Sequence, residues 1–148
     1  TTPFRRFQNN GESLRRPSRR GILGLCLWTL IFSACGRDLG AARGVVEEFV
    51  DRHYVAFDLK KAKEYCIGLA LKKINEEIRL TAGHTIDEST HKPRIYYKLL
   101  EAKEKEVRAS FLFEGTIRTE DAPEFKRRWL VSAQKDGGQW RVSNFTEY

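Results

Sequence analysis

The sequence lacks any hydrophobic run long enough to cross a bilayer. Its longest uncharged apolar stretch, residues 22–32, would form a helix of about 16 Å, whereas a bilayer core is about 30 Å thick. The 148 residues also lack methionine and begin at Thr1, which leaves the start of the precursor open. There are no internal repeats. The length fits one domain preceded by a targeting segment.

The part of the chain expected to fold also lacks a strong excess of positive charge. The formal net charge is +7, but residues 1–34 hold six arginines and one acid, while residues 35–148 hold 21 basic and 19 acidic side chains. A nucleic-acid-binding protein carries its basic patch on the folded domain. The sequence therefore predicts no nucleic-acid partner.

Residues 1–34 have the three parts of a secretory signal peptide. An arginine-rich stretch precedes the apolar run 22–32, and small residues follow it. The sequence Phe32-Ser33-Ala34-Cys35 then resembles the lipobox of bacterial lipoproteins, with Phe32 where leucine is usual. The resemblance implies that the Cys35 sulfur receives a diacylglyceryl group and that the chain is cut before it. The alternative is a cysteine buried in an apolar helix, as expected for Cys26.

The same resemblance implies a location. The protein would be anchored by lipid on the periplasmic side of the bacterial cell envelope, with Gly36 favouring the outer membrane over the inner. General secretion is the favoured export route, and residues 18–23 also resemble a twin-arginine motif. With lipid on Cys35, Cys66 has no disulfide partner in the mature chain, so it is expected to be buried.

After a short tether, 35–40, the pattern becomes helical. Apolar residues recur at helical spacing over 42–57, with charged residues, among them Glu47, Glu48 and Asp51, on the outer face. Asp58 is placed to cap a second helix over 59–66. A third helix is predicted over 69–80, followed by a polar loop over 82–93.

The second half of the chain changes to an alternating pattern. Residues 107–118 alternate apolar and polar side chains, which predicts a half-buried strand. Two more strands, 125–134 and 140–145, flank the hairpin signal KDGGQ. Residues 94–103 have local helix preference, but the order of elements and the paired aromatics favour a strand.

These elements predict an α+β domain with three helices on one face of an antiparallel sheet of about four strands. Residues 41–148 resemble the NTF2-like superfamily through VVEEFVDRHYVAFDLKKA and RRWLVSAQKDGGQWRVSNF. The closest resemblance is to its uncharacterised exported and lipoprotein members. It implies a cone-shaped fold with a pocket between the curved sheet and the first helix.

A pocket of this kind is catalytic in some members of the superfamily and only binds a partner in others. Proton transfer needs a carboxylate base and an acid on one inner face, and the sequence places no Asp–Tyr or Asp–His pair there. His53 lies on the apolar stripe of the first helix, where it can be a proton shuttle or a hydrogen-bonded core histidine. The side chains expected to line a pocket, or else to pack as core, are His53, Tyr54, Tyr97, Phe111, Phe113 and Trp129.

The favoured function is a non-catalytic binding domain held at the membrane by a lipid and recognising an envelope protein or a small ligand. The alternative is a small-molecule-binding protein or weak isomerase- or hydrolase-type enzyme that uses the cone pocket. No cofactor and no metal are predicted, and His84 and His91 are expected to be solvated loop residues. A homodimer through the sheet is compatible with the sequence. The two functions differ in whether the protein's own side chains fill the cone.

Overall fold

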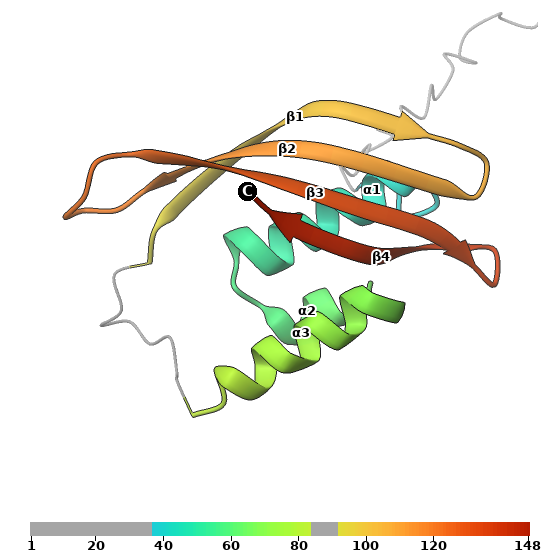
Figure 1. Cartoon of the computed structure of the whole chain (residues 1–148), viewed down its shortest axis with the longest axis horizontal. Helices are drawn as coiled ribbons and strands as arrows, with labels where there is room; N and C mark the ends of the chain where they lie inside the picture. The colour runs from blue at the N-terminus through green and yellow to red at the C-terminus, as the bar shows by residue number, and fades with distance from the viewer. Residues whose placement is uncertain (1–36, 84–91) are drawn as a thin grey trace, which may run out of the picture. The chain divides into compact units, whose positions relative to one another are not determined.

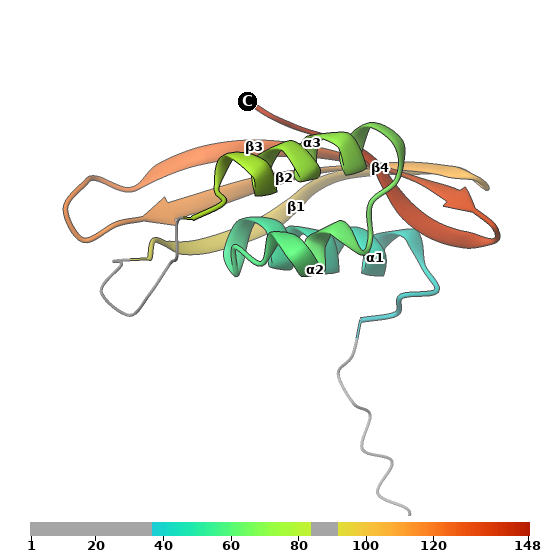
Figure 2. The ribbon, with the colours of Figure 1, turned by 90° about the horizontal axis from the view of Figure 1, so that it is seen from below.

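The computed structural model describes residues 37–83 and 92–148, and these form an α+β domain. In Figure 2 the helices gather on one face of the sheet, and the other face carries none of the described helices. This confirms the predicted fold class, with its helices before its strands.

The first helix buries the predicted stripe but changes its pitch. Helix α1 (Ala42–Val50) continues as a π-helix, η1 (Asp51–Val55), in which the Ala56 N–H donates to the Asp51 carbonyl at 2.8 Å. Phe57 then has a φ of 56°. The helix therefore ends at Val55, two residues before the predicted end, because the left-handed backbone at Phe57 cannot continue it.

Helix α2 (Leu59–Lys63) begins at the predicted cap, where the Asp58 carboxylate accepts the Lys61 N–H at 3.1 Å. It ends three residues before the prediction because Tyr65 and Ile67 instead form hydrogen bonds with Val142 of a strand. Helix α3 (Gly68–Leu80) follows directly. No helix among residues 37–83 and 92–148 has the length and apolarity needed to traverse a membrane.

Four antiparallel strands follow in the described part of the chain, paired in the order of the sequence (Figure 1). They are β1 (Arg94–Glu104), β2 (Arg108–Arg118), β3 (Phe125–Asp136) and β4 (Gln139–Glu147). The ambiguous segment 94–103 is thus a strand, in agreement with the order of elements rather than with its local helix preference.

The details of the meander follow from local chemistry. Gly137 and Gly138 both have positive φ, 56° and 82°, which a two-residue hairpin turn needs and which glycine adopts without strain. Leu100 is the extra residue of a bulge between β1 and β2. The outer edge of β4 is partly covered, because Val142 exchanges hydrogen bonds of 2.8 Å with Tyr65 and Ile67.

The core lies between the helices and the inner face of the sheet. Every second residue over 109–115 of β2 and over 129–133 of β3 points into it, as the alternation predicts. Its largest fully buried side chains are Trp129, Phe49, Phe111, Phe113, Ile74, Val46, Val50, Val131 and Val142.

Candidate functional site

The aromatic residues predicted to line a pocket are packed against one another in the core. Trp129 is 1% exposed, and Phe111 and Phe113 are fully buried. The Tyr54 ring stacks on Trp129 with centroids 4.1 Å apart and planes 6° from parallel. Gly115 leaves room for the indole, because a Cβ there would overlap the Trp129 ring. The inner face of the sheet is therefore filled by the chain's own side chains.

His53 lies at the helix side of the same core and is paired with a carboxylate. Its Nε2 lies 2.5 Å from Glu77 Oε2 of α3, and its ring stacks on Phe49 at 5.2 Å. His53 is 7% exposed, whereas the Glu77 side chain is 37% exposed. The sequence analysis missed Glu77 because it lies 24 residues from His53 on a face with several other charges.

Two polar atoms in this region, one of them on His53 itself, are buried without a hydrogen-bond partner among the described residues. They are His53 Nδ1 and the hydroxyl oxygen of Tyr54. Burial raises the pKa of the Tyr54 phenol well above its ordinary value, and the carboxylates of Glu147 and Glu77 add to the shift. Tyr54 is therefore a neutral phenol at physiological pH. The imidazole and the phenol ring are thus packed edge to face in the core, and the Glu77 carboxylate joins the imidazole from the partly exposed side.

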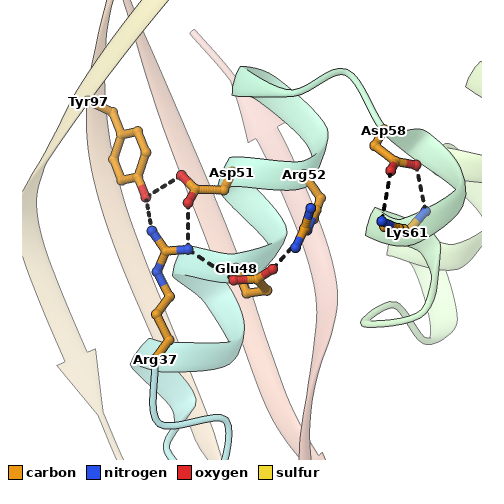
Figure 3. A network of polar contacts seen from close by, with 7 residues as sticks. All are labelled: Arg37, Glu48, Asp51, Arg52, Asp58, Lys61 and Tyr97. Carbon is orange, nitrogen blue, oxygen red and sulfur yellow. Dashed lines mark hydrogen bonds and ion pairs between the residues drawn. The ribbon is translucent and has the colours of Figure 1, made fainter. Parts of the chain in front are cut away.

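A second polar cluster joins the segment before α1 to η1 and β1 (Figure 3). The Arg37 guanidinium lies 3.0 Å from a Glu48 oxygen and 2.5 Å from an Asp51 oxygen, and donates to the Tyr97 hydroxyl at 3.2 Å. The Tyr97 hydroxyl in turn donates to Asp51 Oδ1 at 2.7 Å. Arg52 completes the cluster by donating to Glu48 at 2.8 Å.

The electrostatics of this cluster favour a structural role. Burial lowers the pKa of Arg37, but its hydrogen bonds to Asp51 and Glu48 outweigh that effect and raise it overall. Burial and the hydrogen bond to Asp51 together raise the pKa of the Tyr97 phenol. Both groups therefore keep their protons. The Asp51–Tyr97 pair that the sequence analysis did not find is stabilised by Arg37 rather than poised to transfer a proton.

Among residues 37–83 and 92–148, the surface hollows beside Lys103, beside Phe57 and beside Arg94 are not lined by His53, Tyr54, Tyr97, Phe111, Phe113 or Trp129. One of about 550 Å³ lies on the helix-free face of the sheet, between Lys103, Leu112 and Arg128. Another of about 650 Å³ lies between the end of η1 and the end of α3, beside Phe57 and Ile78.

Cys66 is buried, and its thiol donates to the Ala62 carbonyl at 3.4 Å. Burial raises the pKa of this thiol to about 12, which makes it a poor nucleophile. Three further residues singled out in the sequence, Cys35, His84 and His91, lie outside the described residues. Across 37–83 and 92–148, no group of three or more His, Cys, Asp and Glu side chains is arranged to hold a metal ion.

No family model matches this sequence, and no curated protein matches it. One similar solved structure is that of RPA3114, a SEC-C motif containing protein from Rhodopseudomonas palustris. It has a TM-score of 0.54 and 14% identity, over 74% of this chain and 80% of that one. The intermembrane space region of the chloroplast protein ARC6 has a TM-score of 0.43 and 13% identity, over 74% of this chain and 95% of that one. At this level of identity, the likeness to RPA3114 shows the fold alone.

Proposed function

We propose that the chain is a lipid-anchored protein of the bacterial cell envelope whose domain binds a partner without catalysing a reaction. The anchor rests on the sequence: arginines, an 11-residue apolar run and then Phe32-Ser33-Ala34-Cys35. We also propose the finer NTF2-like assignment, which the helices on one face of a long-stranded antiparallel sheet support.

The filled interior of the domain is the observation that supports a binding role without catalysis. An enzyme of this architecture needs an open cavity in which a base and an acid face the substrate. Here the stacked rings of Tyr54 and Trp129 occupy that position, and Phe111 and Phe113 are fully buried beside them. A partner would then meet the outer surface of the domain, and the hollow beside Lys103 and Arg128 on the helix-free face is one place where it can bind.

One observation favours the second candidate, a site for a small molecule. The pair of His53 and Glu77 reaches from the core to solvent, with unpartnered polar atoms beside it on His53 and Tyr54. If this pair binds a ligand, replacing His53 with alanine should abolish binding and leave the fold intact. If His53 is a core residue, the same change should lower the free energy of unfolding and alter no binding.

The decisive experiment is the native mass of the protein extracted in mild detergent from its own membrane. We expect a chain that starts at Cys35 and carries a diacylglyceryl group, with no further small molecule bound. The Cys35→Ser variant should remain unprocessed, whereas the matched variant Cys26→Ser, within the leader, should be processed normally. An uncut, unlipidated wild-type chain would contradict the anchor, and a stoichiometric small ligand would favour the second candidate. The same spectrum reports whether two copies pair, as the sequence allows.

A further inference from the structure

The segment ahead of α1 is attached to the domain rather than free of it. Residues 37–40 were expected to belong to a tether, yet the Asp38 carbonyl accepts the Ala41 N–H at 3.1 Å and lies directly against Gly44. A Cβ at position 44 would overlap that carbonyl oxygen. Glycine at this position therefore lets the segment fold back along α1.

Arg37 holds the N-terminal end of the segment 37–40 against the domain. Its guanidinium contacts Glu48 and Asp51 on the helix and the Tyr97 hydroxyl on β1 (Figure 3). We call these four side chains the N-terminal clasp. The Arg37 side chain is 32% exposed, and its partners Glu48 and Asp51 are 16% and 33% exposed. Several partly buried charged contacts that share one guanidinium hold a chain end more firmly than a single exposed ion pair does.

The distance from the clasp to the expected lipid is short. Cys35 precedes Arg37 by two residues, and two residues of fully extended chain span at most about 7 Å. A chain held at Arg37 therefore keeps the acyl chains close to the outer side of α1 and to β1. A free tether over residues 35–40 would instead allow the domain to rotate in all directions above the bilayer.

From these contacts we propose that the N-terminal clasp fixes the orientation of the domain on the lipid bilayer, with the side formed by α1 and β1 against the membrane. This inference rests on the proposed lipid anchor at Cys35. Leu39 supports it, because this apolar side chain is 49% exposed within the attached segment, where it can contact the acyl–headgroup boundary. Helix α3 lies over β4, away from this side (Figures 1 and 2), and is left facing the envelope space.

The inference can be tested with the lipidated protein in phosphatidylcholine vesicles that contain a headgroup-quencher lipid. A fluorophore is attached at Tyr96→Cys of β1 in one sample and at Leu69→Cys of α3 in another. Tyr96 is 55% exposed and Leu69 is 50% exposed, and both lie far along the chain from Cys35, so a free tether would not by itself hold either label near the bilayer. Cys66 does not compete for the label, because it is buried. We expect several-fold stronger quenching at position 96 than at position 69.

Two variants test the clasp itself. Arg37→Ala should bring the two quenching values together. The control Arg43→Ala removes an exposed arginine that pairs with Glu47 on the same helix and is not part of the clasp, and it should leave the two values apart. Gly44→Ala should act like Arg37→Ala, because it displaces the attached segment without removing a charge. Circular dichroism confirms that each variant is folded.

Each outcome decides the matter. A lipidated chain with equal quenching at positions 96 and 69 would overturn the fixed orientation and leave the lipid anchor intact. Unequal quenching that survives both Arg37→Ala and Gly44→Ala would overturn the role of the clasp. A chain that the mass spectrum shows to carry no lipid would overturn the proposed function and this inference with it.

Discussion

Replacing Trp129 with alanine tests whether the interior of the domain is filled. The indole is 1% exposed, stacks on Tyr54 at 4.1 Å and sits over Gly115, where no side chain can move in to replace it. Removing a buried tryptophan side chain costs about 3–5 kcal/mol of unfolding free energy, since transfer and cavity terms add. We expect the upper part of that range, because the adjacent glycine limits how far the site can collapse.

Urea unfolding followed by circular dichroism measures this loss. The control is Trp140→Ala, which removes a half-buried tryptophan whose ring lies 5.4 Å from Lys135 Nζ at the end of the sheet. It should cost clearly less than Trp129→Ala. If the alanine variant at position 129 does not fold, Trp129→Phe keeps part of the ring and still leaves a partial cavity.

Indole added to the variant provides the discriminating measurement. An apolar cavity binds a small aromatic molecule, and ligand at 100 times its Kd adds about 2.7 kcal/mol of stability. Indole should therefore raise the Tm of Trp129→Ala and leave that of the wild-type protein unchanged. A loss below about 1 kcal/mol in the variant would mean that the tryptophan is not a core side chain. An equal rise of Tm in the wild-type protein would mean that its interior is open.

Three further predictions concern single groups. Glu77→Ala leaves His53 without its partner and should cost about 1–3 kcal/mol of unfolding free energy in urea, whereas the neighbouring exposed Glu76→Ala should cost less; equal losses would show that the pair is unimportant. Burial raises the pKa of Glu48, but its arginine partners outweigh that effect and lower it below 4.5, so its contribution to stability is complete above that pH and is lost as the pH falls through the folded-state pKa. Glu48→Gln should therefore flatten the acid side of a stability–pH curve, and an unchanged curve would contradict this. Cys66, whose pKa is raised to about 12, should react with a thiol reagent at pH 8 only after unfolding in urea, and rapid labelling of the native protein would show that it is not buried.

The strands could be predicted from the sequence because their signals are local. Alternation over residues 107–118 and the pair Gly137-Gly138 act within a few residues of themselves, and the structure confirms both. The pitch change at η1 could not be predicted, because an α-helix and a π-helix bury much the same stripe over one turn. The early end of α2 has a similar cause. Residues 65–67 pair with Val142, and that contact is not visible in the helix pattern.

The two polar clusters show why the candidate site was harder to find. His53 and Tyr97 were both singled out, but their carboxylate partners lie 24 and 46 residues away. Those partners, Glu77 and Asp51, lie among several other charges on helix faces, so periodicity does not distinguish them. Only the tertiary fold determines which carboxylate on a charged helix face lies next to His53 or Tyr97.

The segment before α1 is also attached by contacts that its sequence does not reveal. Residues 35–40 have the composition of a tether, and nothing local distinguishes Arg37 from a solvated arginine. The structure gives Arg37 four partners on three elements, namely Glu47 and Glu48 of α1, Asp51 of η1 and Tyr97 of β1. Gly44 lacks the side chain that would prevent the approach. A position that composition assigns to a linker is thus bound to the domain, and one of its contacts, with Tyr97, depends on β1 lying beside η1 in the folded protein. The orientation proposed for the domain therefore depends on its tertiary structure as much as on the linker sequence.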